Sequence, residues 1–167
     1  MNEVRDNPSY RRTLDDFQVG HVFEHWPHKT ITEGDNNLFC LLTMNHHPVH
    51  LDAEYCKQHP YGRILVVGTY VLSLVVGMSV ADLSGAAIAN LEYERITHDG
   101  PVFIGDTIRA CTRILDVRPS RTKPDRGVLY VQTEAFNQQG VRVLTLRRKL
   151  LLPRRLPTEG ERSDEGL

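Results

Sequence analysis

Cysteine is scarce in this sequence. The three cysteines, Cys40, Cys56 and Cys111, are odd in number and far apart, and no two of them form a CxxC pair. A disulfide-bonded small domain carries a denser, even-numbered set, and a structural zinc site uses closely spaced pairs of ligands. The sequence therefore predicts reduced, buried thiols rather than a disulfide framework or a zinc centre.

Long hydrophobic runs are also missing. The longest apolar stretch, residues 66–83, is interrupted by Thr69, Ser73, Ser79 and Asp82. It falls short of the roughly 20 predominantly apolar residues that a membrane-spanning helix needs. The N-terminus has no basic segment followed by an apolar one, so we expect no secretory signal. These absences predict a cytoplasmic protein without a membrane partner.

Neither sign of charge is in excess. The chain has 20 Lys and Arg against 21 Asp and Glu, and its formal net charge is −1. Proteins that grip nucleic acid through its phosphates concentrate basic side chains on one face, so no nucleic-acid partner is predicted. Basic residues do gather in residues 118–126 and 147–155. Local clusters of this kind can hold the phosphates of a small molecule.

The residues that are present suit one soluble domain. Hydrophobic residues make up 40% of 167 residues and charged residues 25%, which is an ordinary balance for a globular protein. Residues 1–13 are polar, and we expect them to be loosely ordered. Residues 14–153 form the single domain, without internal repeats. Residues 154–167 have almost no apolar side chains and are expected to be a disordered tail.

The first half of the domain is predicted to contain a capped helix. Thr32 and Asp35 have the spacing of a capping box, in which each side chain accepts a hydrogen bond from the other residue's backbone. The helix should extend from Thr32 to a stop at Pro48, because proline disfavours helix in the residue before it. Its apolar face is predicted from helical spacing, and its members are Leu38, Phe39, Leu41 and Leu42.

The second half reads as one long helix followed by strands. Apolar residues fill every face of residues 68–83, which predicts a helix buried all round and closed by Gly85. Candidate strands follow, with NQQG at 137–140 as a hairpin turn. They are residues 87–96, 107–117, 127–136 and 141–152, after short strands at 19–23 and 29–31. The pattern predicts an α+β domain in which an antiparallel sheet wraps one buried helix.

Three segments, taken in order, resemble a known family. MNHHPVHLD at 44–52 resembles a hydratase motif in which Asp-x-Asn-Pro-x-His-x-Asp is usual. YGRILVVGTY at 61–70 is similar to the segment that enters the family's central helix at a glycine. GPVFIGDTI at 100–108 is like its Pro-Val-Phe-x-Gly-Asp signature. The chain thus resembles the MaoC-type enoyl-CoA hydratases, which have the hot-dog fold, over roughly residues 17–153.

The resemblance implies a fold, a partner and a reaction. The fold is a sheet curled around one long helix, usually paired as a homodimer with the sheets joined edge to edge. The reaction is reversible addition of water to a trans-2-enoyl-CoA, giving an (R)-3-hydroxyacyl-CoA, with coenzyme A as part of the substrate and no other cofactor. TEGDN followed by LLTMN is similar to the mesaconyl-CoA hydratase and β-methylmalyl-CoA dehydratase branch, which implies a short, branched dicarboxylic acyl group.

The chain departs from the family motif at two positions. Asn45 stands where the family has aspartate, and His47 stands where it has asparagine, whereas Pro48, His50 and Asp52 are retained. Histidine titrates near neutral pH, so His50 is the predicted general base that activates water; the alternative is a surface histidine at a helix end. An amide is no base, so Asn45 is predicted to hold water or substrate by hydrogen bonds.

Other candidate residues would bind the substrate. The backbone N–H of Gly68, at a helix start, is predicted to hold the thioester oxygen; the alternative is a packing glycine. Asp52 would orient His50 or pair with a cation, or else cap a helix. The predicted partners of the coenzyme A phosphates are basic residues that otherwise form a solvated surface: Arg63, Arg121, Lys123 and Arg126.

Several alternatives remain at this point. Asp35 is about 15 Å along the helix from Asn45, at 1.5 Å per residue, so capping suits it better than catalysis. His46 and His50 are four residues apart, but Pro48 between them spoils helical metal-ligand geometry, so no metal is predicted. The same scaffold supports thioesterases, which usually place an acid on the central helix, where residues 66–81 have none. Non-catalytic binding of an acyl-CoA or acyl carrier is the third possibility.

Overall fold

A computed structural model describes residues 8–155 of the chain. Its centre is an antiparallel sheet with the strand order β1-β4-β5-β6-β3, and β2 pairs with β4 outside this path. The strands are β1 Val22–Glu24, β2 Lys29–Thr30, β3 Ala89–His98, β4 Thr107–Pro119, β5 Arg126–Phe136 and β6 Arg142–Pro153. The predicted strands are present, but the short strand predicted at 19–23 begins only at Val22, and the ends of the long strands are shifted by one or two residues.

Two hairpins connect the long strands. Asn137 and Gly140 close the predicted NQQG turn: the Gly140 N–H donates to the Asn137 carbonyl, and Gly140 has φ 78°. The other hairpin joins β4 to β5 through the polar, proline-containing loop. Inward and outward side chains alternate along β5, as expected for a sheet with one face covered.

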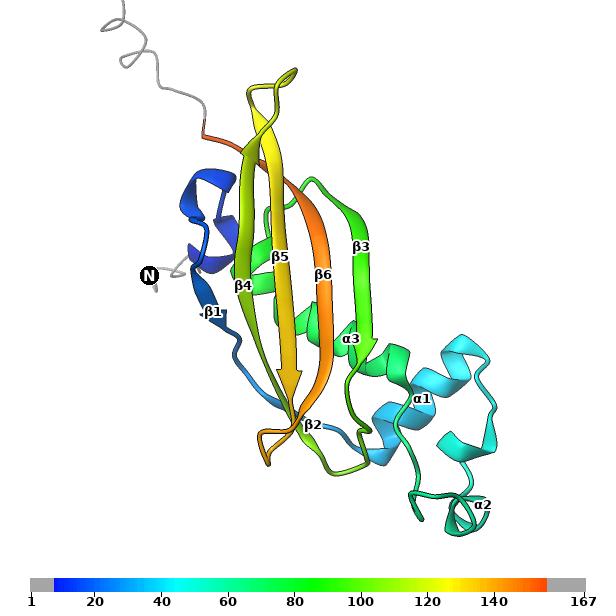
Figure 1. The fold of residues 1–167 in the computed structure, drawn as a ribbon. Helices are drawn as coiled ribbons and strands as arrows, with labels where there is room; N and C mark the ends of the chain where they lie inside the picture. Colours follow the sequence, from blue (N-terminus) through cyan, green and yellow to red (C-terminus); the bar gives the residue numbers. More distant parts are fainter. Residues whose placement is uncertain (1–7, 156–167) are drawn as a thin grey trace, which may run out of the picture.

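The covered face packs against α3, which spans Gly68–Met78 and crosses behind the sheet in Figure 1. Val71 and Val75 of α3 are buried against strand residues such as Ala110, Ala135 and Leu144. The helix predicted over residues 68–83 is α-helical only as far as Met78, and residues Val80–Ser84 form a π-helical turn. The prediction that this helix is buried on every face is wrong, since Thr69, Ser73 and Gly77 are exposed.

Helix α1, Glu33–Thr43, lies beyond the β3 edge of the sheet together with α2, Ala53–Lys57 (Figure 1). The capping box at its start is confirmed: Thr32 Oγ1 accepts from the Asp35 N–H at 3.2 Å, and Asp35 Oδ2 accepts from the Thr32 N–H at 2.8 Å. The helix stops at Thr43 rather than at Pro48, because Met44 takes a left-handed conformation with φ 59°.

The apolar face predicted for α1 is wrong for its three leucines, whereas Phe39 is half-buried and its ring centre lies 5.4 Å from that of Tyr70. Leu38, Leu41 and Leu42 are 58–74% exposed, and the residues of α1 that are fully buried are Asn36 and Cys40. Cys40 and Cys56 are buried free thiols, as predicted, and Cys111 is a half-buried one. None of the helices in residues 8–155 is long and apolar enough to cross a lipid bilayer.

The N-terminal and C-terminal predictions fall mostly outside the described residues. Residues 1–7 and 156–167 are not described. Pro8–Arg11 form a short 3-10 helix within the segment predicted to be loosely ordered. Arg154 and Arg155, at the start of the predicted tail, both donate hydrogen bonds to the Asp15 carboxylate.

Candidate active site at the start of the central helix

A cavity of about 440 Å³ opens where α3 begins. His50 lines it from the 3-10 turn Pro48–His50, which follows α1, and Gly68 and Val71 line it from α3. Residues 98–102, from the last residue of β3 onward, supply a third wall. All three segments of the family resemblance therefore contribute to one cavity, although they are far apart in the sequence.

His50 is held in one ring orientation and one tautomer. Its Nδ1 lies 2.7 Å from the backbone carbonyl oxygen of Leu65. A carbonyl oxygen only accepts hydrogen bonds, so Nδ1 carries the proton that is donated. In the neutral ring, Nε2 is then unprotonated and is the nitrogen available to a molecule in the cavity. This is the state that a general base requires.

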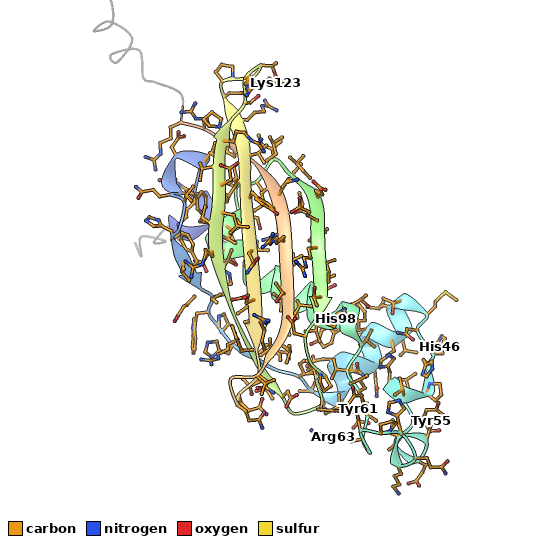
Figure 2. All side chains as sticks on the ribbon, in the orientation of Figure 1. His46, Tyr55, Tyr61, Arg63, His98 and Lys123 are labelled. Carbon is orange, nitrogen blue, oxygen red and sulfur yellow. The ribbon has the colours of Figure 1, made fainter. Side chains whose placement is uncertain are left out.

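Gly68 and His98 are in direct contact. A β-carbon added to Gly68 would lie 2.8 Å from His98 Cε1 and 3.0 Å from His98 Nε2, which is closer than real side chains approach. Glycine at the start of α3 therefore lets the His98 ring lie against the helix backbone. Figure 2 shows His98 at the end of β3 that meets α3, with Tyr61 nearby. Sequence reasoning missed His98, although it lies two residues before the third motif.

The backbone at the start of α3 is open to a ligand. The first N–H groups of a helix have no carbonyl partner within it. Within residues 8–155, the N–H groups of Gly68 and Thr69 donate no hydrogen bond to another protein atom. The Gly68 N–H could therefore donate a hydrogen bond to a thioester oxygen, as predicted, because Gly68 lines the cavity and its N–H has no protein acceptor.

The third motif forms a wall of the cavity and the turn that supports it. Gly100 and Pro101 line the cavity directly. Asp106 is buried and accepts hydrogen bonds from the Phe103 N–H at 2.9 Å and the Gln138 side chain at 2.9 Å. Asp99, a lining residue that sequence reasoning also missed, accepts from the Thr145 hydroxyl at 2.6 Å. The motif's carboxylate thus holds a turn rather than reacting.

Two residues of the first motif do not line the cavity. Asn45 Oδ1 accepts from the His47 N–H at 3.4 Å, and the predicted contact of Asn45 with water or substrate stays a prediction. Asp52 is the N-cap of α2 and accepts from the Tyr55 N–H at 2.9 Å. The Leu65 carbonyl, rather than Asp52, orients the His50 ring. The predicted part of Asp52 in substrate binding likewise stays a prediction.

Asp35, the other acid considered, is engaged at the start of α1. The Lys29 ammonium lies 2.8 Å from Asp35 Oδ2 and, together with the capping bonds, lowers the pKa of this carboxyl to about 2. Asp35 is therefore ionised and paired at neutral pH. It does not line the cavity, in agreement with the interpretation that it caps the helix.

The predicted phosphate-binding residues separate into two places. Arg63 lies with its guanidinium 3.7 Å from the centre of the Phe103 ring, beside Tyr61 at the cavity. Arg121 and Lys123 belong to the β4–β5 loop, at the opposite end of the sheet from His98 (Figure 2). Arg126 pairs with Asp125 at 2.7 Å. Within one chain, Arg63 is the member of this set that lies near His50.

Residues 8–155 contain no group of three His, Cys, Asp or Glu side chains arranged to hold a metal ion. The rings of His47 and His50 are 6.1 Å apart, and His47 Nδ1 accepts from the Val49 N–H. The polar side chains that line the cavity are those of His50, Tyr61, His98 and Asp99.

The MaoC like domain family model matches residues 16–135 of this chain. The chain belongs to the MaoC-like family. A mesaconyl-CoA hydratase from Cereibacter sphaeroides is 29% identical over 144 residues, covering 86% of this chain and 42% of that protein. A β-methylmalyl-CoA dehydratase from Chloroflexus aurantiacus is also 29% identical, over 86% of this chain and 41% of its own length.

Solved structures agree on the fold of this MaoC-like chain. The structure of a monoamine oxidase regulatory protein from Archaeoglobus is 30% identical in sequence, with TM-score 0.78, covering 87% of this chain and 96% of that one. A Mycobacterium tuberculosis protein described as a double hot-dog fold has TM-score 0.79 at 22% identity, covering 89% of this chain and 46% of that one. The predicted hot-dog fold is confirmed. The chain spans less than half the length of the two curated relatives.

Proposed function

We propose that this MaoC-like chain adds water reversibly across the double bond of a 2-enoyl-CoA. The observation that carries the proposal is the state of His50: Leu65 fixes its Nδ1–H, and Nε2 is left as a base at a cavity beside the open N-terminus of α3. The names of the two curated relatives support the same reaction class.

The geometry suggests a two-stage reaction. His50 Nε2 takes a proton from water as the water oxygen forms its bond to C3 of the substrate. The electron pair of the C2–C3 double bond moves toward the thioester, whose oxygen gains negative charge and accepts a hydrogen bond from the Gly68 N–H. The protonated His50 then returns its proton to C2, which restores the thioester and the neutral base.

The direct test compares three purified proteins on crotonyl-CoA and mesaconyl-CoA. His50→Ala should lower kcat by about 10²–10⁴-fold, the usual range for removing a general acid–base group. His46→Ala is the matched control, because His46 is an exposed histidine on the same segment that does not line the cavity, and it should behave like the wild type. Unchanged turnover in His50→Ala would sink the proposal.

Parallel measurement of free thiol separates hydration from thioester hydrolysis. Hydration consumes the enoyl absorbance without releasing coenzyme A, whereas a thioesterase releases the thiol. Residues 68–78 of α3 contain no carboxylate, and we expect no thiol release. If the chain binds acyl-CoA in a calorimeter yet turns over no member of the panel, non-catalytic binding takes the place of this proposal.

We propose further that the acyl group is short and carries a second carboxylate, as the names of the curated relatives suggest for their substrates. Apart from His50, the lining residue that can carry a positive charge is His98. His98→Gln, which is polar and stays neutral, should lower kcat/KM for mesaconyl-CoA more than for crotonyl-CoA. An equal loss for both substrates would argue against this assignment.

A further inference from the structure

Asn36 is hydrogen-bonded both to the segment that carries His50 and to the residue before Gly68. It lies on α1, is 0% exposed, and is not one of the residues that line the cavity. Its Nδ2–H donates to the backbone carbonyl of His50 at 2.9 Å. Its Oδ1 accepts from the backbone N–H of Val67 at 3.1 Å. One side chain thus bonds to the segment of the base and to the residue before Gly68.

The two segments are also joined by a backbone hydrogen bond from the Leu65 N–H to the Val49 carbonyl at 3.1 Å, and the Asn36 amide adds a second connection beside it. Val67 is the N-cap residue of α3, and its side chain supplies no capping hydrogen bond. The His50 carbonyl lies at the end of a turn of only three residues, Pro48–His50. A buried polar group without a partner is destabilising, so both bonds of the Asn36 amide are expected to be kept.

Only an amide of this length suits both partners. Asparagine offers a donor and an acceptor on one short side chain, and here the donor meets a carbonyl and the acceptor meets an N–H. An ionised aspartate retains the acceptor and loses the donor, and alanine or leucine loses both. The requirement also explains why a polar residue occupies the buried face of α1, where leucines were expected.

We propose that Asn36 is a positioning residue, which fixes the His50 base relative to the N–H groups that begin α3. The inference rests on the proposed hydratase function, because it assigns those two groups to one reaction. Misplacing a catalytic group by about 1 Å can cost on the order of 100-fold in rate. The effect of Asn36 should therefore fall on kcat rather than on KM, since Asn36 does not line the cavity.

Asn137 provides a matched control for loss of a buried asparagine. It is 7% exposed, and its Oδ1 accepts from the backbone N–H groups of Gln139 and Val141 in the β5–β6 hairpin. Asn36→Ala and Asn137→Ala both remove a buried amide that holds loop backbone. Both should lower the melting temperature, but only the first lies between the base and α3.

The experiment measures kcat, KM and melting temperature of the wild type, Asn36→Ala and Asn137→Ala on an enoyl-CoA, well below each melting temperature. Asn36→Ala should lower kcat 10- to 100-fold with KM within about threefold of the wild type. Asn137→Ala should retain nearly full kcat. If Asn36→Ala does not fold, Asn36→Asp replaces it, because the carboxylate keeps the bond to Val67.

A second measurement separates failure of this inference from failure of the proposed function. Nitrogen NMR of the histidine rings reports the tautomer without any substrate. The wild type and Asn137→Ala should show His50 protonated at Nδ1 alone, and the Asn36 variant should show a mixture of tautomers. A loss of kcat in Asn36→Ala no larger than in Asn137→Ala overturns the inference. If the wild type has no hydratase activity, an unchanged His50 tautomer overturns it.

Discussion

At the scale of single residues, the contact of Gly68 with His98 leaves no room for a side chain at position 68. A methyl group on Gly68 would meet three atoms of the His98 ring within 3.2 Å. We expect Gly68→Ala to lower the free energy of unfolding by roughly 1–3 kcal/mol, as overpacking does, and to reduce kcat by moving the helix N-terminus. Urea denaturation and the crotonyl-CoA assay measure the two effects.

The double variant Gly68→Ala/His98→Ala is the control for this explanation. Removing the ring leaves room for the new methyl group, so the double variant should be more stable than the sum of the two single changes predicts. Simple additivity of the two stability changes would show that the ring contact is not the cause.

A second prediction at this scale concerns the buried histidine His25. It is 1% exposed, its Nδ1–H donates to Asp82 at 2.8 Å, and its Nε2 accepts from the Thr112 hydroxyl at 2.7 Å. Burial lowers the pKa of His25 below its ordinary value, and the bond to Asp82 opposes this effect without reversing it. The folded protein therefore binds this proton less well than the unfolded chain does.

The sign of the pH effect follows from that difference. The His25 contribution to stability is fully present above the unfolded pKa of about 6.5 and is lost as the pH falls from there toward the lower folded pKa. Urea unfolding at pH 7.5, 6.5 and 5.5 should show this loss in the wild type and a flatter profile in His25→Gln. Identical slopes for the two proteins would contradict the assignment to His25.

At the scale of elements, α1 carries Asn36, whose side chain is hydrogen-bonded to the backbone of His50 and Val67. Its first turn depends on the Thr32 capping box and on the Lys29–Asp35 ion pair. Thr32→Ala removes the oxygen that accepts from the Asp35 N–H, and it should cost about 1 kcal/mol of stability. Thr30→Ala, in the preceding strand, is a suitable control and should cost less. A smaller effect for Thr32→Ala than for Thr30→Ala would rule out the cap as a main restraint.

Helix α1 also shows how far local sequence determines structure. The capping box depends on residues three apart, so its geometry could be predicted from the sequence alone. The apolar face could not, because it depends on what the helix packs against, and α1 turns Asn36 and Cys40 inward while Leu38 and Leu42 face outward. Hydrophobic spacing favours a core face only where an apolar core lies next to the helix.

The residues of the candidate site also differ in how far the sequence alone predicts them. His50 and Gly68 could be predicted because they lie inside recognisable motifs. His98 could not, since it joins Gly68 only after β3 has paired with β6 and brought its end to the start of α3. Arg121 and Lys123 follow β4, which carries the chain roughly 40 Å along the sheet at about 3.4 Å for each of its 13 residues, and their predicted contact with coenzyme A stays a prediction.

At the scale of the whole molecule, β3 is a long strand with one edge that pairs with no other strand of residues 8–155. It pairs with β6 on one side and ends the strand order on the other. Leu91, Tyr93 and Ile96 of β3 are 41–50% exposed, and an exposed edge of this kind is a template for pairing with another strand. The homodimer expected from the family resemblance would cover this edge, and we propose that it does.

The dimer makes a prediction about solution size. Leu91→Lys places a charge on the free edge and should shift the protein from dimer to monomer in light scattering after gel filtration. Val141→Lys is the matched control, because Val141 is similarly exposed, at 52%, but lies in the β5–β6 hairpin, and it should remain dimeric. A wild-type monomer at micromolar concentration would exclude the edge-to-edge dimer.

In the proposed reaction, His50 moves a proton between water and C2 of an enoyl-CoA. The most direct measurement is hydration of crotonyl-CoA in D₂O, followed by proton NMR of the product. The wild type should give 3-hydroxybutyryl-CoA with one deuterium at C2, and His50→Ala should form it at least about 100-fold more slowly. Equal rates of deuterium incorporation for the two proteins would contradict the assignment of His50 as the base.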